Sequence, residues 1–193
     1  EMKILITGIN GNLGRYCANH FSSKGFKVVG LSRTSDNFFK NKNITVISYQ
    51  NISKIESYLE EVEVVLHFAA STGFNKSDYE YIDSNLISTL KLIELIKKNK
   101  KNNINRILFT STSSVYGEGQ YLCNNHQIVT KVTRRIFDLE NKNWEPFCPL
   151  CNSKIIPTFT NEDCETSNQH IYAITKNMSE NIFRNFSSEY NIN

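Results

Sequence analysis

The chain has 193 residues, of which 39% are hydrophobic, so it can bury one sizeable core and is too short for two. Its 22 basic and 19 acidic residues nearly balance, and no basic stripe alternates with aromatic side chains, which argues against nucleic acid as a partner. No stretch approaches the roughly 20 apolar residues that a membrane span needs, so we expect no membrane partner and a cytoplasmic location.

Apolar runs alternate with helical patterns along most of the chain. The expected strands cover residues 3–7, 27–31, 44–48, 62–68 and 104–110, and the expected helices cover residues 13–24, 53–61, 79–99 and 171–190. This alternation predicts an α/β fold, a doubly wound parallel sheet of the Rossmann type that spans residues 1–193. The third expected helix carries an apolar stripe at helical spacing, which we expect in the core: Leu86, Leu90, Ile93 and Ile96.

The pattern breaks at about 118–160, where the three prolines, the only tryptophan and three of the five cysteines lie. We interpret this segment as an insertion. The sequence stops at Asn193, directly after the last expected helix, where a dinucleotide-binding fold usually adds a sixth strand. We therefore expect that part of the fold is absent from this chain.

The first expected strand runs into a glycine-rich turn, and the turn opens into the first expected helix. Gly8 permits a tight turn, Gly11 lets the backbone approach a pyrophosphate, and Gly14 lets the helix lie close to the strand. The helix N-terminus offers N–H groups and a positive dipole end to phosphates. The motif therefore predicts a dinucleotide site, with a purely structural turn as the alternative.

A second motif lies far downstream, on the helix expected at 171–190. Tyr172 and Lys176 are four residues apart, so their side chains project from one face of that helix. A nearby ammonium lowers the pKa of a phenol, so Tyr172 could remove a proton from a sugar hydroxyl while hydride leaves the same carbon for a nicotinamide. The alternative for an isolated pair is an ordinary amphipathic helix with an exposed lysine.

Hydroxyl side chains follow the fifth expected strand, between Phe109 and Gly117. They lie at the carboxyl end of the predicted sheet, where ligands bind in open α/β folds, so one of them could hold a substrate hydroxyl. The alternative is a loop whose hydroxyls bond to the local backbone.

In their order along the chain, these motifs closely resemble those of the extended short-chain dehydrogenase/reductase family, specifically the nucleotide-sugar epimerases and dehydratases. In that family a His-x-Ala-Ala segment after the fourth strand lines the cofactor path, and an Asn opens an N-V-x-G-T motif in the next helix. The resemblance implies that NAD or NADP is bound by Gly8, Asn10, Gly11, Asn12, Leu13, Gly14, Ser32, Arg33, Phe68, Ala69, Ala70, Asn85, Tyr172 and Lys176.

The same resemblance implies a catalytic set. The family's catalytic hydroxyl stands three residues before the Val of Val-Tyr-Gly, which is Thr112 here, and Tyr172 and Lys176 complete the set. Lys176 would also bond the nicotinamide ribose. Family members often dimerise, so a homodimer is one expectation.

The implied function is that of a nucleotide-sugar 4-epimerase. The dehydratases place Asp-Glu directly after the Thr, whereas this chain has Ser113 and Ser114, so dehydration is not expected. The alternatives are an NADP-dependent keto-sugar reductase and a non-catalytic fragment that only binds a dinucleotide. In this family the C-terminal part binds the nucleotide-sugar, and we expect that part to lie beyond Asn193.

Two further departures concern the cofactor. NAD-preferring members carry an Asp at the end of the second strand, where this chain has Ser32 and Arg33. An arginine there can accommodate the 2′-phosphate of NADP, or it can stack on adenine with either cofactor. The acidic residue usual after the third strand is replaced here by Gln50 or Asn51.

The insertion carries four candidate metal ligands in two pairs, Cys123 with His126 and Cys148 with Cys151. Each pair is spaced by two residues, as in small zinc ribbons, and four N/S ligands suit a tetrahedral, structural Zn²⁺ with no open position. Unrelated thiols and a surface histidine are the alternative. The insertion also looks like one found in a subset of bacterial nucleotide-sugar epimerases.

Overall fold

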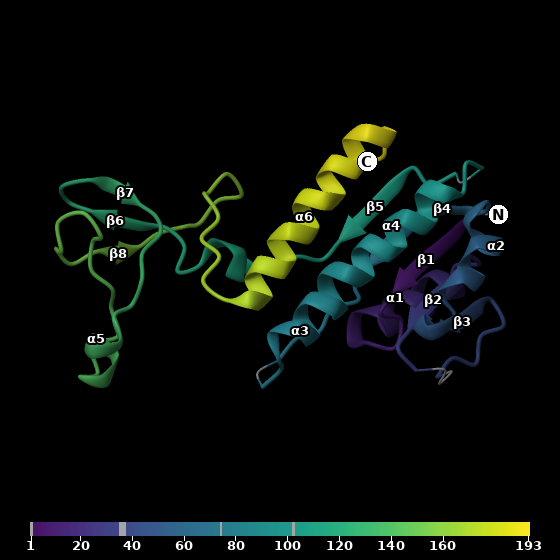
Figure 1. Cartoon of the computed structure of the whole chain (residues 1–193), viewed down its shortest axis with the longest axis horizontal. Coiled ribbons are helices and arrows are strands. Elements are labelled where there is room, and N and C mark those ends of the chain that lie inside the picture. Colours follow the sequence, from purple (N-terminus) through teal and green to yellow (C-terminus); the bar gives the residue numbers. More distant parts are fainter. Residues whose placement is uncertain (1, 35–37, 74, 102) are drawn as a thin grey trace. The chain divides into compact units, whose positions relative to one another are not determined.

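The computed structural model describes residues 2–34, 38–73, 75–101 and 103–193. The chain divides into two compact units (Figure 1). The first unit comprises Glu1–Ser111 and Met178–Asn193, and the second comprises Thr112–Asn177.

The first unit is built on a five-stranded, wholly parallel sheet with the order β3-β2-β1-β4-β5. The chain moves outward from β1 to β3 and then returns to the other side of β1, so the strand order reverses between β1 and β4. The doubly wound α/β fold is therefore confirmed. The strands are β1 (Lys3–Thr7), β2 (Lys27–Ser32), β3 (Ile44–Ser48), β4 (Val62–His67) and β5 (Arg106–Phe109).

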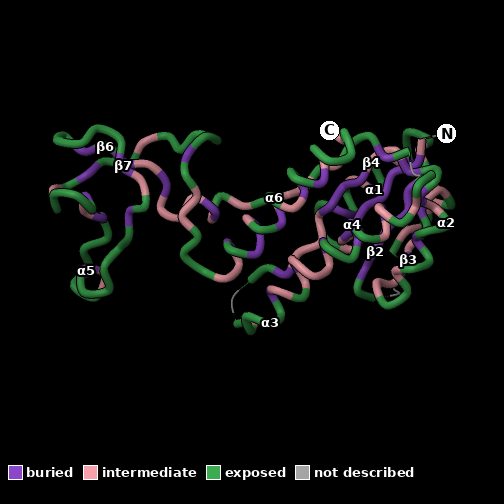
Figure 2. The backbone as a smooth tube through the Cα atoms, turned by 45° about the horizontal axis from the view of Figure 1, so that its top comes forward, coloured by how far each residue is buried: buried purple, intermediate pink, exposed green. Residues whose placement is uncertain are grey.

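Helices cover both faces of this sheet, because successive strand residues point to opposite faces and both sets are apolar. In β1, Ile4 and Ile6 pack in the cluster that includes Ala18 of α1, while Leu5 packs in the cluster formed with α2, α4 and α6. Figure 2 shows the resulting burial of the strands. The helices are α1 (Asn12–Ser23), α2 (Glu56–Leu59), α3 (Asp78–Tyr81), α4 (Ser88–Lys98) and α6 (Ile171–Tyr190), with 3₁₀ and π-helical turns at η1 (Tyr49–Ile55) and η2 (Ile82–Ile87).

The expected apolar stripe on the third helix is only partly right. Its two C-terminal members are buried, but Leu86 is half-buried and Leu90 is 38% exposed. The inward positions one residue earlier belong to Asn85 and Thr89, whose polar groups find hydrogen-bond partners inside the protein. The π-helical turn η2 also has more residues per turn than an α-helix, so a pattern drawn with the α-helical period is out of phase there.

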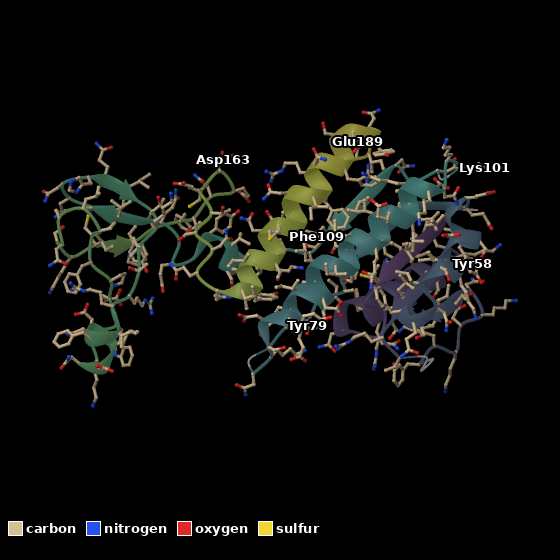
Figure 3. All side chains as sticks on the ribbon, in the orientation of Figure 1. Tyr58, Tyr79, Lys101, Phe109, Asp163 and Glu189 are labelled. Carbon is tan, nitrogen blue, oxygen red and sulfur yellow. The ribbon has the colours of Figure 1, made fainter. Side chains whose placement is uncertain are left out.

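Aromatic rings fill the space between the end of the sheet and α6. The ring of Phe109 lies 5.7 Å from that of His67 and 5.1 Å from that of Phe183, centroid to centroid (Figure 3). The backbone of Asn193 is hydrogen-bonded to β5, because Ile107 N–H donates to Asn193 O at 2.8 Å.

The second unit contains a small antiparallel sheet of order β7-β6-β8, and the insertion expected at about 118–160 falls within this unit. Its own core is formed by Tyr121, Cys123, Val129, Val132, Cys148 and Ile155. Its elements are η3 (Ser113–Tyr116), β6 (Tyr121–Cys123), β7 (Gln127–Val129), α5 (Ile136–Glu140) and β8 (Ile156–Pro157). Across the described ranges of the chain, no helix combines the length and the apolar character needed to cross a bilayer.

Candidate functional site

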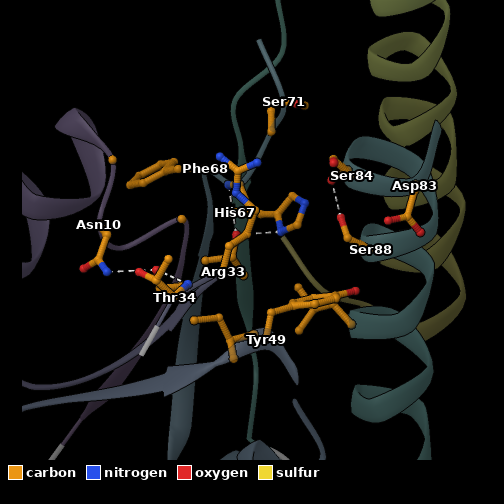
Figure 4. Close-up of a pocket in the computed structure, with 18 residues that line it drawn as sticks. Asn10, Arg33, Thr34, Tyr49, His67, Phe68, Ser71, Asp83, Ser84 and Ser88 are labelled. Carbon is orange, nitrogen blue, oxygen red and sulfur yellow. Dashed lines mark hydrogen bonds between the residues drawn. The ribbon is translucent and has the colours of Figure 1, made fainter. Parts of the chain in front are cut away.

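A cavity of about 360 Å³ lies at the carboxyl ends of the strands of the first unit (Figure 4). Its lining includes Thr7 at the end of β1, Ser32 at the end of β2 and His67 at the end of β4. This is the crevice where the strand order reverses, the place at which open α/β sheets bind ligands. The cavity brings together many of the predicted cofactor residues: Gly8, Asn10, Gly11, Ser32, Arg33, Phe68, Ala69 and Ala70.

The glycine turn forms a close backbone cradle at one side of the cavity. Gly8 has φ +68°, and a Cβ atom on it would lie 2.9 Å from the backbone of Ala69. A Cβ on Gly14 would lie 2.3 Å from Gly8 O, so α1 can approach the turn only without a side chain there. Gly11 caps α1 without a side-chain hydrogen bond, and the first turn holds no acidic residue. The cradle therefore fits an anionic group such as a pyrophosphate.

The remaining residues of the glycine motif do not line the cavity. Asn12 and Leu13 form the first turn of α1, and both side chains are exposed. Gly14 is buried beneath the turn. The backbone N–H groups of this first turn remain available to a phosphate, as expected for a helix N-terminus.

A chain of buried hydrogen bonds supports the cradle from below. Thr89 Oγ1 donates to Asn85 O at 2.6 Å, and it lies 3.0 Å from His67 Nε2. Because the single hydroxyl proton of Thr89 is already used, Nε2 must carry the proton of His67, and Nδ1 accepts from Thr7 Oγ1 at 2.9 Å. Thr7 Oγ1 in turn accepts from Ala69 N–H at 3.1 Å. The hydrogen bond that Thr89 donates to Asn85 O thus leaves Thr89 Oγ1 to accept from Nε2–H of His67.

Asn85 is buried and is not part of the cavity lining. Its side chain accepts from Ser71 N–H at 2.6 Å and donates to Ser71 O at 3.3 Å. Its backbone carbonyl accepts from Ser179 on α6 at 3.2 Å. In this structure Asn85 therefore holds the segment after β4 in place.

Several cavity residues were missed from the sequence. Tyr49 lines the cavity directly after β3, and Gln50 and Asn51, which follow it in η1, are both exposed. Ser88 was detectable, since it stands at the fourth place of the Asn-Leu-Ile-Ser-Thr segment that the family fills with glycine, whereas Asp83 lies in η2 without a sequence signal.

The end of β2 offers hydroxyl and guanidinium groups to the cavity. Ser32 Oγ accepts from Asn10 Nδ2 at 2.8 Å, which ties the glycine turn to β2. Arg33 and Thr34 follow and also line the cavity, and both are exposed. Among the described residues at this strand end, none is a carboxylate.

The three predicted catalytic residues lie in the second unit. Thr112 caps η3, and its Oγ1 accepts from Ser114 N–H at 3.3 Å, so the alternative of local backbone bonding holds for this hydroxyl. Tyr172 and Lys176 lie one turn apart on α6, as expected. Lys176 is only 2% exposed, which contradicts the alternative of an exposed lysine. The Tyr172 ring stacks on His170 with the centroids 6.1 Å apart.

The sequence profile of the NAD dependent epimerase/dehydratase family matches residues 4–136. The chain belongs to this family. The match runs through the glycine cradle, the cavity and the start of the second unit.

The chain matches individual known proteins over only part of their own length. The chain is 31% identical over 134 residues to Protein CapI of Staphylococcus aureus, covering 60% of this chain and 39% of that protein. It is 28% identical over 133 residues to the UDP-glucuronate 4-epimerase of Thermodesulfobacterium geofontis, covering 58% of this chain and 40% of that protein. The solved UDP-glucuronic acid 4-epimerase of Bacillus cereus, in complex with NAD, superposes with a TM-score of 0.66 at 21% identity, over 99% of this chain and 54% of that one. This chain thus spans two fifths to one half of these relatives, and the structural likeness shows the fold.

The four candidate metal ligands of the insertion form a cluster, and two of them lie beyond the segment 4–136 that matches the family. Cys123 Sγ lies 3.7 Å from Cys151 Sγ and 3.5 Å from His126 Nδ1, and Cys148 Sγ lies 3.7 Å from the same nitrogen. All four ligand atoms lie within 4.8 Å of one another. A tetrahedral zinc site, with Zn–S of about 2.3 Å and Zn–N of about 2.0 Å, requires S···S of about 3.8 Å and S···N of about 3.5 Å. The donor set therefore fits such an ion.

Ser153 lies against two of these sulfurs, 3.4 Å from Cys123 Sγ and 3.1 Å from Cys151 Sγ. The hydrogen bond from Ser153 is the main cause that lowers the pKa of Cys123 to about 5, and it also lowers the pKa of Cys151. The hydrogen bond with Cys123 raises the pKa of His126. The shifts of Cys123 and Cys151 favour the thiolate form that binds metals, whereas burial raises the pKa of Cys148 and keeps that thiol protonated.

Proposed function

We propose that this chain forms the cofactor-binding part of a nucleotide-sugar 4-epimerase that uses NAD. The observation that carries the proposal is the glycine cradle at the edge of a cavity, at the strand reversal of an epimerase/dehydratase family fold. The names of the relatives support it, because the proteins from T. geofontis and B. cereus are UDP-glucuronate 4-epimerases and the latter holds NAD.

In this proposal, the cavity holds the dinucleotide along its length. The backbone of Gly8 and Gly11 and the first turn of α1 face the pyrophosphate, as the N–H groups and the dipole of a helix N-terminus favour. Ser32 and Arg33 face the adenosine ribose at the end of β2. The backbone after β4 forms the wall, through Phe68, Ala69 and Ala70, and Asn85 fixes that wall from behind.

The chemistry assigned to this chain is proton transfer. Bound NAD supplies a reversible hydride acceptor. Tyr172 accepts the proton of the sugar C4 hydroxyl, and the ammonium of Lys176 one turn away favours the phenolate that does so. Lys176 also bonds the nicotinamide ribose, and Thr112 turns its hydroxyl from local bonding to the sugar oxygen. After the keto sugar has turned over, the alcohol would be restored by return of the hydride to C4 together with return of the proton from Tyr172 to the C4 oxygen.

An NADP-dependent keto-sugar reductase is the second candidate, and Arg33 is the observation that favours it. The guanidinium stands at the strand end where a 2′-phosphate would lie, and the described cavity residues there include no carboxylate to oppose that phosphate. The two functions differ in how the cofactor is used. An epimerase retains its cofactor through the cycle, whereas a reductase must exchange it.

The same proposal includes a structural Zn²⁺ bound by Cys123, His126, Cys148 and Cys151. Four protein ligands leave no open position, so this ion would hold the insertion together and take no part in the reaction. The agreement between the ligand spacing and tetrahedral geometry supports it.

The test is the cofactor content and affinity of the purified chain. The protein is denatured, and the released nucleotides are separated and quantified. Cofactor-free protein is then titrated with NAD and NADPH by calorimetry. Near-stoichiometric NAD or NADH, or a clear preference for NAD, supports the epimerase. A clear preference for NADPH would favour the reductase instead. Binding of neither dinucleotide would overturn the proposed function.

A further inference from the structure

We propose that Glu180 is a positioning residue: by accepting a hydrogen bond from Ser111, it joins the segment that leads to Thr112 to the helix that carries Tyr172 and Lys176. The inference rests on the proposed function, since it concerns the support of the proposed catalytic set. Glu180 lies outside the sequence motifs and outside the cavity lining.

The first observation is where this hydrogen bond lies along the chain. The chain leaves the first unit after Ser111 and returns to it at Met178. Ser111 Oγ donates to the carboxylate of Glu180, across 69 positions of the sequence. Both partners belong to the first unit, so the bond clamps together the two points at which the chain passes between the units.

The second observation is that the proposed catalytic residues stand beside these two points. Thr112 follows Ser111 directly. Tyr172, Lys176 and Glu180 are each four residues apart on α6, so they fall on one face of that helix. The clamp is therefore one residue away from the proposed catalytic hydroxyl and one helical turn away from the proposed catalytic lysine.

The surroundings make Glu180 a firm anchor. Its neighbour Ser179 is buried and donates to Asn85 O at 3.2 Å, which ties this turn of α6 to η2. One turn further along, the Phe183 ring packs against that of Phe109 at the end of β5, with the centroids 5.1 Å apart. The carboxylate thus stands on a fixed part of the helix, and its hydrogen bond passes that position on to the loop after β5.

The test measures the Kd of NAD and the Kd of ADP by calorimetry for the natural chain and for Glu180→Ala. ADP has the adenosine and both phosphates, but it lacks the nicotinamide ribose that Lys176 bonds in the proposed function. Loss of the clamp should therefore affect NAD alone, whereas general damage to the glycine cradle would affect both ligands. Glu189→Ala is the matched control, because Glu189 also lies on α6 and pairs with Lys97 at 3.5 Å.

Glu180→Ala should bind NAD about 3- to 10-fold more weakly, the loss expected for one hydrogen bond, and should bind ADP like the natural chain. Glu180→Gln keeps an oxygen that can accept from Ser111, so its Kd for NAD should stay within about twofold. Glu189→Ala should leave both Kd values unchanged.

Ser111→Ala removes the donor at an exposed position, so it tests the same bond in a second way. It should weaken NAD binding by the same factor as Glu180→Ala. The double variant should bind NAD no more weakly than either single variant, because all three lose the same interaction.

An unchanged Kd for NAD in Glu180→Ala and Ser111→Ala overturns the inference while the proposed function stands. Equal weakening of NAD and ADP also overturns it, because the carboxylate would then support the cradle. A loss in Glu180→Gln as large as that in Glu180→Ala would exclude the hydrogen bond as the cause. If the natural chain binds neither NAD nor ADP, the proposed function fails together with the inference.

Discussion

Thr7 Oγ1 and His67 Nδ1 lie 2.9 Å apart and join the carboxyl ends of β1 and β4, the two strands between which the order of the sheet reverses. Here a buried imidazole also connects them to α4, through Thr89. Two side chains of the cavity lining, Thr7 and His67, therefore join the strands to each other and to α4.

Replacing His67 with Phe keeps a ring of similar size but removes both of its hydrogen bonds. Thr7 and Thr89 would each lose a buried partner, so we expect a loss of about 1–3 kcal/mol in the free energy of unfolding, measured by urea denaturation. His20→Phe is the control, since His20 is an exposed residue of α1. Equal stability of the two variants would show that the hydrogen-bond chain does not hold the strands together.

Substitution of two glycines of the cradle should affect different properties, stability in one case and NAD binding in the other. A Cβ on Gly14 would lie 2.3 Å from Gly8 O and 2.7 Å from Ile9 Cα, so Gly14→Ala should lower the stability by about 1–3 kcal/mol. A Cβ on Gly11 would meet only Gly8 O, at 3.2 Å, so Gly11→Ala should fold with a nearly unchanged melting temperature. It should still weaken NAD binding about tenfold or more, because the new methyl group stands where the pyrophosphate approaches. Normal NAD affinity in Gly11→Ala would contradict the assigned cradle.

The fold could be predicted from the sequence because its signals are local and periodic. Apolar runs after turn residues located all five strands of the parallel sheet, and the glycine motif fixed the first turn. What failed was phase. Leu90 was expected inside and is 38% exposed, because a π-helical turn and the inward polar pair Asn85 and Thr89 change which positions face the sheet.

The site was predicted where a residue type is required by backbone geometry and missed where contacts are long-range. Gly8 and Gly14 are required because a side chain would collide with neighbouring backbone, and such positions repeat in a motif. Tyr49 reaches the cavity through the placement of β3 beside β2, a pairing that no local pattern encodes. Asp83 comes from η2, whose irregular turn likewise has no sequence signal.

Removal of the metal should unfold the second unit selectively. If Zn²⁺ is bound as proposed, elemental analysis should find about one zinc ion per chain, and the double variant Cys148→Ser with Cys151→Ser should contain none. Thermal unfolding of that variant should show an earlier transition, since binding of structural zinc contributes directly to folding. Cys17→Ser is the control, as Cys17 lies on α1 outside the cluster. Unchanged metal content in the double variant would exclude the site.

The proposed proton transfer predicts a split between binding and turnover. Tyr172→Phe removes the proposed proton acceptor, so in a protein that also carries the sugar-binding part the reduction of bound NAD by a nucleotide-sugar should slow by about 10²- to 10⁴-fold. The Kd for NAD should rise by no more than about tenfold, because Tyr172, also expected among the cofactor-binding residues, would supply one hydrogen bond at most. Tyr190→Phe, near the other end of α6, is the control. Equal rates for Tyr172→Phe and the natural chain would remove Tyr172 from the reaction.

Tyr49 should also affect stability at alkaline pH. Its pKa is raised to about 12 in the folded protein, chiefly by burial, while an unfolded tyrosine titrates near 10. Below pH 10 Tyr49 keeps its proton in both the folded and the unfolded chain, so it adds no pH dependence to the free energy of unfolding in that range. Between pH 10 and 12 the unfolded chain releases its proton more readily than the folded one, and the free energy of unfolding falls as the pH rises.

Tyr49→Phe has no proton to release, so its urea midpoint should fall less between pH 9 and pH 11 than that of the natural chain, with the midpoints compared at each pH. Tyr16→Phe, at a tyrosine that is 71% exposed, should follow the natural chain through the same range. Parallel losses in all three proteins would mean that the Tyr49 phenol loses its proton as readily in the folded as in the unfolded chain.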